Sequence, residues 1–195
     1  MIKRVGIIFI SCWILLGTVY AKSYQWQQIR FEYSNIWEVV TNRTVNGNRI
    51  IRLSQQVQDS YPLSIMLSFI PKSIKGNQHF DTNNGMPGGI KAVDYAWPLI
   101  KRFANIREKS DLLVTFNQVL VSNNLASGAL VLVPTPKKGI YISGQTFYLA
   151  KRDYYILGCV ISRVDKGVMR RSSDYAKRIK SAYILLRNLK FGVGP

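Results

Sequence analysis

The sequence predicts an α+β protein, in the form of an α/β/α sandwich with a central, mainly antiparallel sheet and two principal helices. Many of its apolar runs are short and are separated by turn residues, which is typical of antiparallel hairpins. Two other segments, one in the middle of the chain and one near its end, carry apolar residues at helical spacing. A helix with one apolar stripe must bury it, and here the sheet is the surface that can cover it.

The first 21 residues have the pattern of a secretory signal peptide. Lys3 and Arg4 supply the positive charge, residues 5–16 are mainly apolar, and Val19 and Ala21 stand at positions −3 and −1 of a cleavage site. The apolar run is too short for a stable membrane span, and no charged stop-transfer flank follows it. We therefore expect cleavage near Ala21 and a periplasmic or secreted mature protein.

Residues 22–195 then form one domain. Cys12 offers an alternative, because "FISC" loosely resembles a lipid-attachment motif, but cleavage there would leave the apolar "WILLG" at the new N-terminus, so the ordinary signal peptide is favoured. Without Cys12, Cys159 is the one remaining cysteine, and no internal disulfide can form. Cys159 lies in the apolar run "YYILGCVISRV", so a buried thiol is favoured over a reactive one.

The chain is strongly basic. It has 27 Lys and Arg against 10 Asp and Glu, a net charge of +17; without Lys3 and Arg4 the mature chain has 25 against 10, a net charge of +15. A field of this sign attracts phosphate backbones, acidic lipid headgroups, anionic glycans and acidic proteins. A high net charge also serves solubility alone.

The N-terminal half of the mature chain has the pattern of strands joined by tight turns. Ser34 has turn chemistry, and Asn46 with Gly47 in "VNGN" is the strongest hairpin signal, because both residues tolerate positive φ. Strands are predicted at residues 29–33, 37–43, 49–56 and 63–71. Pro71 ends the last of them, and the Gly-, Asn- and Pro-rich residues 72–89 are predicted to form a long loop, where binding residues tend to lie.

A helix is predicted to begin at Gly89. Its apolar stripe consists of Ile90, Val93, Trp97, Ile100 and Phe103 or Ala104. Pro98 lies inside this pattern, so we expect a kink or an early break there. Four antiparallel strands are predicted to follow, at residues 112–122, 126–134, 139–151 and 153–164.

The last predicted helix spans residues 174–189, with Ser172 or Ser173 as its N-cap. One stripe of this helix is apolar and consists of Tyr175, Ile179, Ala182, Tyr183, Leu186 and Leu189. Basic residues occupy much of the remaining surface: Lys177, Arg178, Lys180, Arg187 and Lys190.

Two stretches of the chain resemble a known family. "FEYSNIWEVV" (31–40), which precedes the strands "RIIRLS" and "LSIMLSFIP", and the closing "AYILLRNLKF" (182–191) resemble the PsbP-like superfamily, the group of PsbP, DcrB and Mog-type proteins. Its members begin with an aromatic strand, a short turn and a Trp that opens the next strand, here Phe31, Tyr33 and Trp37. The resemblance implies an α/β/α sandwich and a non-enzymatic accessory, assembly or interaction role, with no catalytic residues. Trp37 itself is expected to be a core anchor.

The sequence offers few residues for catalysis or metal binding. His79, the only histidine, lies two residues from Asp81 and would be the base of a small hydrolase, but an exposed loop histidine is favoured. One histidine and one buried cysteine cannot supply a zinc site, and the acidic residues are too scattered for calcium. The Gly-rich residues 83–89 precede a helix but lack the Gly-Lys-Ser/Thr of a phosphate-binding loop. We expect no catalytic residues, no metal and no cofactor.

Basic residues interleaved with aromatic ones are the candidate binding residues. They fall in the stretches 136–139, 148–155 and 165–180, which could converge on one surface for an anionic ligand or partner, although for each stretch alone a solvated basic face is favoured. The candidate anion- or partner-binding residues are Arg163, Lys166, Arg170, Arg171, Lys137, Lys138, Lys151 and Arg152. The candidate stacking residues beside them are Tyr148, Tyr154 and Tyr175.

We therefore expect a non-enzymatic, exported accessory protein that binds another component of the cell envelope, with no small-molecule cofactor. The expected partner is an envelope protein or an anionic polymer or surface. The alternatives are a basic binder of nucleic acid, anionic lipid or glycan, and a small hydrolase that uses His79.

Overall fold

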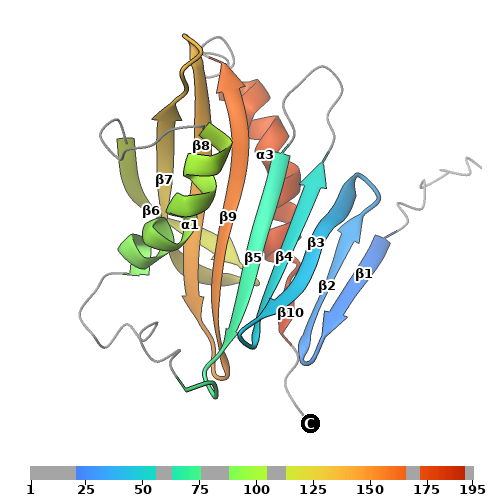
Figure 1. The fold of residues 1–195 in the computed structure, drawn as a ribbon. Helices are drawn as coiled ribbons and strands as arrows, with labels where there is room; N and C mark the ends of the chain where they lie inside the picture. The colour runs from blue at the N-terminus through green and yellow to red at the C-terminus, as the bar shows by residue number, and fades with distance from the viewer. Residues whose placement is uncertain (1–20, 56–62, 76–87, 105–112, 166–171, 192–195) are drawn as a thin grey trace, which may run out of the picture.

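The computed structural model describes residues 21–55, 63–75, 88–104, 113–165 and 172–191 of the 195-residue chain. These residues form two antiparallel sheets and two principal helices (Figure 1). The predicted α+β class, with a mainly antiparallel sheet and two principal helices, is therefore confirmed. Within the described ranges, no helix is long and apolar enough to cross a membrane.

The larger sheet has seven strands in the order β3-β4-β5-β9-β8-β7-β6. The strands are β3 (Trp37–Val45), β4 (Asn48–Gln55), β5 (Leu63–Pro71), β6 (Leu113–Val121), β7 (Asn124–Pro134), β8 (Ile140–Ala150) and β9 (Tyr154–Asp165). β3, β4 and β5 form one meander and β6 to β9 form a second, and the two meet where β5 pairs with β9. Every pairing is antiparallel, as the hairpin pattern of the sequence predicts.

The two edge strands of this sheet differ. β3 has a register shift between Val39 and Thr41, and it carries the exposed Arg43. β6 pairs with β7 in unbroken register, contains no charged residue, and leaves Leu113 68% and Phe116 59% exposed. Because bulges and charges keep an edge strand from pairing with other chains, only the β3 edge is protected in this way.

A smaller sheet consists of β1 (Ala21–Trp26), β2 (Ile29–Ser34) and β10 (Lys190–Phe191), with β2 in the centre. Of these three strands, the sequence pattern predicted only β2. β10 has two residues, which is too short for an alternation pattern, and β1 starts at the predicted cleavage site. Through β2, the first and last described segments of the chain lie side by side (Figure 1).

Helix α1 (Gly88–Ala104) packs on β7, β8 and β9. Val93, Trp97 and Ile100 of its predicted stripe are buried. The early break at Pro98 is wrong, because the helix continues through this residue to Ala104. Pro98 lies on the exposed side of the helix. Because proline has no N–H group, the carbonyl four residues earlier has no helical donor, and on this side of the helix it faces water. The buried stripe holds the helix on the sheet.

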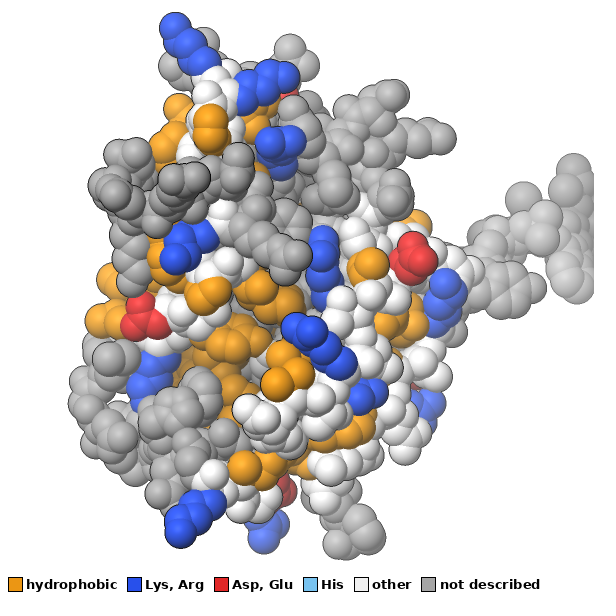
Figure 2. Space-filling view, in the orientation of Figure 1, with side chains coloured by type: hydrophobic (Ala, Val, Ile, Leu, Met, Phe, Trp, Pro, Cys, Tyr) orange, Lys and Arg blue, Asp and Glu red, His pale blue; other side chains and the backbone are white. Residues whose placement is uncertain are grey.

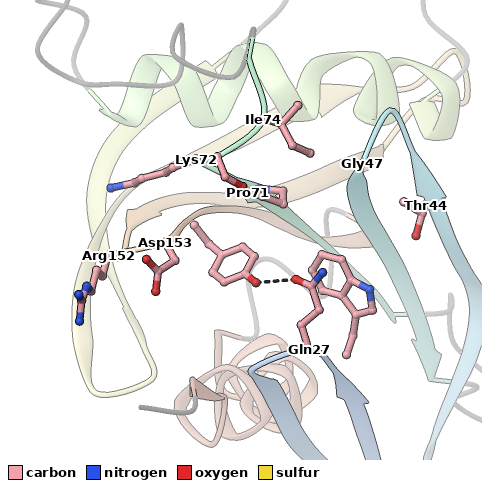
Figure 3. A pocket seen from close by; sticks show the side chains of 11 residues that line it. Gln27, Thr44, Gly47, Pro71, Lys72, Ile74, Arg152 and Asp153 are labelled. Carbon is pink, nitrogen blue, oxygen red and sulfur yellow. Dashed lines mark hydrogen bonds between the residues drawn. The ribbon is translucent and has the colours of Figure 1, made fainter. Parts of the chain in front are cut away.

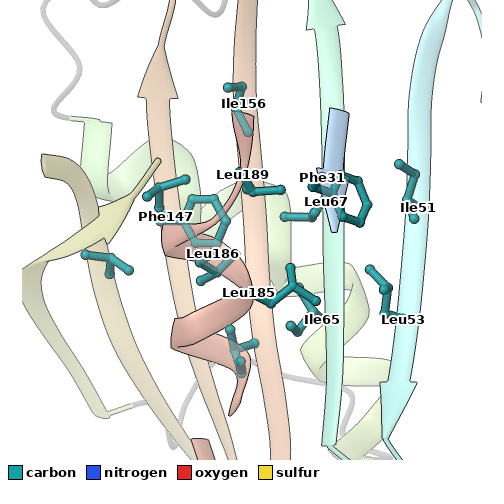
Figure 4. Packing of buried hydrophobic residues seen from close by; sticks show 14 of the residues in the cluster. Phe31, Ile51, Leu53, Ile65, Leu67, Phe147, Ile156, Leu185, Leu186 and Leu189 are labelled. Carbon is teal, nitrogen blue, oxygen red and sulfur yellow. The ribbon is translucent and has the colours of Figure 1, made fainter. Parts of the chain in front are cut away.

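Helix α3 (Ser172–Arg187) begins two residues earlier than predicted. Its C-terminal part and the residues after it bring Leu185, Leu186 and Leu189 against Phe147 and Ile65 of the larger sheet (Figure 4). The predicted stripe missed Leu185, which is 2% exposed. Among the residues of this segment whose burial is described, from Ile179 onward, Ala182, Leu185, Leu186 and Leu189 are buried.

Alternate residues of β9 belong to different parts of the core. Ile156 and Val160 lie in the cluster that includes the α3 leucines, whereas Cys159 and Ile161 lie in the cluster that includes α1. Trp37 belongs to the α3 cluster and is 2% exposed, so its predicted role as a core anchor is confirmed. The alternation means that β9 is covered on both of its faces.

The pairing of β8 with β9 requires a glycine at one position. Gly158 lies opposite Phe147, and a Cβ at position 158 would come within 2.1 Å of the Phe147 Cζ. The aromatic ring therefore lies across the backbone of β9 and occupies the space that a side chain at this position would need. Any larger residue must displace a ring in the middle of the core.

We expect Gly158→Ala to lower the free energy of unfolding by about 1–3 kcal/mol, because the added methyl group overpacks the core against Phe147. Urea unfolding monitored by circular dichroism measures the change. In a Phe147→Leu background the clash is relieved, so the same substitution should cost less there. An equal cost in both backgrounds would show that the ring is not the obstacle.

Candidate functional site

One candidate site is a cavity of about 620 Å³ at one end of the larger sheet, which we call the pole pocket. Four segments that are distant in sequence meet there: the β1–β2 turn, the β3–β4 hairpin, the residues after β5, and the β8–β9 turn. The lining residues are Trp26, Gln27, Thr44, Gly47, Pro71, Lys72, Ser73, Ile74, Arg152, Asp153 and Tyr154. Its volume lies within the range of about 300–1,000 Å³ that is usual for ligand sites.

Aromatic rings and an amide form one wall of the pole pocket. The Tyr154 hydroxyl donates a hydrogen bond of 2.5 Å to Oε1 of Gln27, drawn dashed in Figure 3. The ring of Tyr154 meets the edge of Trp26 at a centroid distance of 6.1 Å and an interplanar angle of 63°. Burial, and secondarily the negative charge of Asp153, raise the pKa of Tyr154, so its hydroxyl remains a neutral donor at physiological pH.

A hydrogen-bond network fixes this wall to the β3–β4 hairpin. Arg49 donates from Nε to the Tyr24 hydroxyl at 2.8 Å and from Nη1 to the Thr44 Oγ1 at 3.0 Å. The Tyr24 hydroxyl donates in turn to Oδ1 of Asn42 at 3.1 Å. The Arg49 guanidinium also lies 6.0 Å from the centroid of the Trp26 ring. One arginine therefore positions both the indole and the Thr44 side chain that line the pocket.

The β3–β4 turn has the geometry that the sequence predicts. Asn46 and Gly47 have φ angles of 50° and 77°, as a tight hairpin turn requires. Gly47 has a second role, because a Cβ there would come within 2.2 Å of Cδ1 of Ile74. The segment after β5 thus rests directly on the hairpin turn and closes the upper side of the pocket in Figure 3.

Two cations and one acid lie on the β8–β9 side of the pocket. The Lys72 N–H donates to the Asp153 carbonyl at 2.9 Å, which ties the end of β5 to the β8–β9 turn. The Lys72 Nζ lies 4.8 Å from the centroid of the Tyr155 ring, and Arg152 is exposed. Neither Lys72 nor Arg152 forms an ion pair with another residue that the structure describes. In Figure 3 the side chains of Lys72 and Arg152 point away from Gln27, so their charges lie at the rim of the pocket.

The structure separates the basic residues that the sequence singled out. Arg152 lines the pole pocket and Lys151 precedes it in the same turn. Lys137 and Lys138 are exposed in the β7–β8 turn, at the other end of β8, roughly 34 Å away for an 11-residue strand. Arg163 lies near that same far end, opposite Ile142. The described members of the set thus form two groups at opposite ends of the sheet.

The remaining residues that the sequence analysis singled out lie partly outside the described residues. Lys166, Arg170 and Arg171 lie there, as do His79 with its neighbour Asp81 and the alternative lipid-attachment residue Cys12. Of the candidate stacking residues, Tyr154 lines the pole pocket, and Tyr148 is buried at 4% exposure beneath α1. Across the ranges that the structure covers, no three His, Cys, Asp or Glu side chains gather as metal ligands.

Several residues of the pole pocket escaped the sequence analysis. Trp26 and Gln27 belong to a hairpin whose turn has no Gly, Asn or Pro, and Gln27 has a φ of 50° despite its side chain. The alternation of Tyr24 and Trp26 with polar residues, repeated after the turn, was the signal that could have revealed it. Lys72 gave no local signal, because only the pairing of β5 with β9 brings it to this site.

Cys159 is fully buried between the sheet and α1, as the apolar run around it predicts. Burial raises the pKa of its thiol far above the ordinary value, so the thiolate is scarce at physiological pH. A reactive thiol needs the opposite environment. The prediction of a structural cysteine is confirmed.

Comparison with known proteins gives one kind of likeness. No protein-family model and no curated protein matches the sequence. The solution structure of cyanobacterial PsbP (CyanoP) from Synechocystis sp. PCC 6803 is similar to this structure, with a TM-score of 0.48, 12% sequence identity, and coverage of 90% of this chain and 95% of that chain. This likeness concerns the course of the chain alone.

We expect the thiol of Cys159 in the mature chain to resist alkylation by iodoacetamide up to pH 9, because burial and the raised pKa both oppose thiolate formation. Mass spectrometry of the intact protein measures the modification. In urea the same residue should react at the rate of an ordinary thiol. Rapid alkylation of the folded protein at pH 7 would contradict the buried position.

Proposed function

We propose that the protein is an exported, non-enzymatic accessory protein that binds another component of the cell envelope by recognising an anionic group of that component at the pole pocket. The scaffold proposed for this role is a three-layer α/β/α sandwich. The packing of α1 and α3 against alternate residues of β9 supports it.

One observation carries the proposal: the pole pocket combines the ring of Trp26 and the hydroxyl of Tyr154 with the cations of Lys72 and Arg152. Aromatic faces beside cations suit ligands that present flat or apolar surfaces together with negative charge, such as anionic glycans and single-stranded nucleic acids. The mature chain, with 25 basic against 10 acidic side chains and a net charge of +15, adds a long-range field that steers such ligands toward the molecule.

The chemistry of the lining favours recognition over turnover. Tyr154 is a neutral donor that already bonds to Gln27, and Thr44 is held by Arg49. Tyr154 donates to Gln27, Thr44 accepts from Arg49, and Lys72 and Arg152 supply positive charge at the rim. A site of this kind holds a ligand by charge and by stacking, without a proton transfer.

Export is part of the proposal and has a test of its own. β1 begins at Ala21, so cleavage after this residue leaves the strand from Lys22 onward, opposite Tyr33, intact. We expect the full chain, produced in a Gram-negative host, to be recovered from the periplasm with Lys22 as its first residue, as measured by intact mass. A product with the first 21 residues attached would contradict the signal peptide. An acylated product that starts at Cys12 would support the lipoprotein alternative.

The pole pocket is tested by removing its two cations. We expect the double variant Lys72→Ala with Arg152→Ala to elute from immobilised heparin at lower salt than the wild type. For a short single-stranded oligodeoxynucleotide, the slope of log K against log salt should fall by about 0.7 for each phosphate contact that is lost. Fluorescence anisotropy at several salt concentrations measures this slope.

The matched control is the double variant Lys137→Ala with Lys138→Ala, which removes the same charge from the opposite end of the sheet. Its slope should equal that of the wild type. If both double variants lower the slope by the same amount, binding is spread over the basic surface and the pole pocket is not the site. Unchanged binding by the Lys72 and Arg152 variant would also show that the pole pocket is not the site.

A further inference from the structure

A second concave site lies on the face of the larger sheet that carries α1. The helix covers β7, β8 and β9, and next to it the strands β3, β4 and β5 line a groove of about 480 Å³, which we call the α1-side groove. Its lining residues are Thr41, Arg43, Ile50, Arg52, Ser64, Met66, Leu99 and Ile161. Figure 2 shows this face of the molecule, on which apolar side chains lie among Lys and Arg side chains.

The groove is distinct from the pole pocket. Arg49 and Ile50 are neighbours on β4 and point to opposite faces, so Arg49 supports the pole pocket while Ile50 lines the groove. On β3, the register shift between Val39 and Thr41 decides which face the following side chains point to. Val39 packs in the core on the α3 side, and beyond the shift Thr41 lies opposite Arg52 in the groove. The bulge therefore brings Thr41 to the face of Arg52.

The two arginines of the groove lie close together on that face. Thr41 pairs with Arg52 and Arg43 pairs with Ile50, so the two arginines are diagonal neighbours on adjacent strands, with a spacing of about 7–8 Å. Arg52 donates from Nη2 to the Ser64 Oγ at 3.4 Å, which orients its guanidinium along the groove. The described lining contains no carboxylate, so the groove has a positive border. Arginine pairs of this spacing suit a carboxylate or phosphate group.

Besides the two arginines, Thr41 and Ser64 are polar, and the other four lining residues are apolar: Ile50, Met66, Leu99 and Ile161. Met66 of β5 and Leu99 of α1 are half-buried, and Ile161 of β9 is 3% exposed. These side chains come from three elements and form a continuous wall between the helix and the arginines. An unbranched side chain such as that of Met66 adapts easily to a ligand. A hydrated ion would gain nothing from this wall, whereas an alkyl chain would bury apolar area on it.

We propose that the α1-side groove binds a single-chain anionic amphiphile, with its alkyl chain on Met66, Leu99 and Ile161 and its carboxylate or phosphate group on Arg43 and Arg52. The volume suits a molecule of this size. A free phosphate ion uses only the arginines, and a wholly acidic peptide leaves the apolar wall unused. An amphiphilic anion satisfies both parts of the lining at once.

The test follows the methyl resonance of Met66 in protein labelled with [methyl-13C]methionine. Dodecyl phosphate, added below its critical micelle concentration, should shift this resonance saturably. Arg43→Gln should weaken binding about tenfold, the loss of one charge-assisted contact, and Arg43→Gln with Arg52→Gln should weaken it further. Leu99→Gln should weaken binding of dodecyl phosphate while leaving the response to inorganic phosphate unchanged.

The controls separate the contribution of the ligand's alkyl chain to binding from that of its charge. Arg30→Gln with Arg187→Gln removes two exposed cations elsewhere and should leave the affinity for dodecyl phosphate unchanged. Dodecyltrimethylammonium, with the same chain and the opposite charge, should bind at least tenfold more weakly. The proposal is overturned if inorganic phosphate or a hexaglutamate peptide binds as tightly as dodecyl phosphate. It is also overturned if the two double variants have the same affinity, or if the resonance of Met66 does not move.

Discussion

The pairing of β5 with β9 is the constraint on which the rest of the structure depends. It joins residues from distant parts of the chain, from Ser64 opposite Ile161 to Pro71 opposite Tyr154, and it makes one sheet out of two meanders. Both strands are buried along most of their length. The pairing also brings the residue after Pro71 beside the β8–β9 turn. These two segments form one side of the pole pocket. Long-range contacts of this kind are slow to form, and side chains of β9 are buried here in two separate clusters of the core.

Local patterns in the sequence predicted the elements well and their arrangement only in part. The alternation of apolar and polar residues and the Asn46–Gly47 turn predicted the strands, and apolar residues at helical spacing predicted both helices. Each of these patterns depends on residues that are close in sequence. The break predicted at Pro98 was wrong, because the packing of α1 on the sheet outweighs the cost of a proline inside the helix. Successive turns of a meander lie at opposite ends, which is why Lys137 and Arg152 are far apart. The meeting of Trp26 with Tyr154 could not be predicted, because it depends on where the smaller sheet lies against the larger one.

The β3–β4 hairpin connects the two candidate sites. Alternate residues of β4 face opposite sides, so Arg49 supports the pole pocket from one face while Arg52, together with Arg43 of β3, borders the α1-side groove on the other. The hairpin is attached to the rest of the sheet along β5 only, and on its other side it is held through Tyr24 and Trp26 of the smaller sheet. A ligand that shifts the hairpin at one site therefore acts on side chains of the other.

The exposed edge of β6 has a consequence for how the molecule behaves in crowded or polyanionic surroundings. Nine uncharged residues offer their backbone groups and the side chains of Leu113 and Phe116 to any extended chain, with no bulge to discourage it. Mutual repulsion between copies with a charge of +17 is then the main barrier to edge-to-edge joining. A polymer that neutralises this charge, or concentrated salt that screens it, lowers that barrier. The positive charge thus keeps the copies apart, and neutralising it favours assembly of the chains with each other.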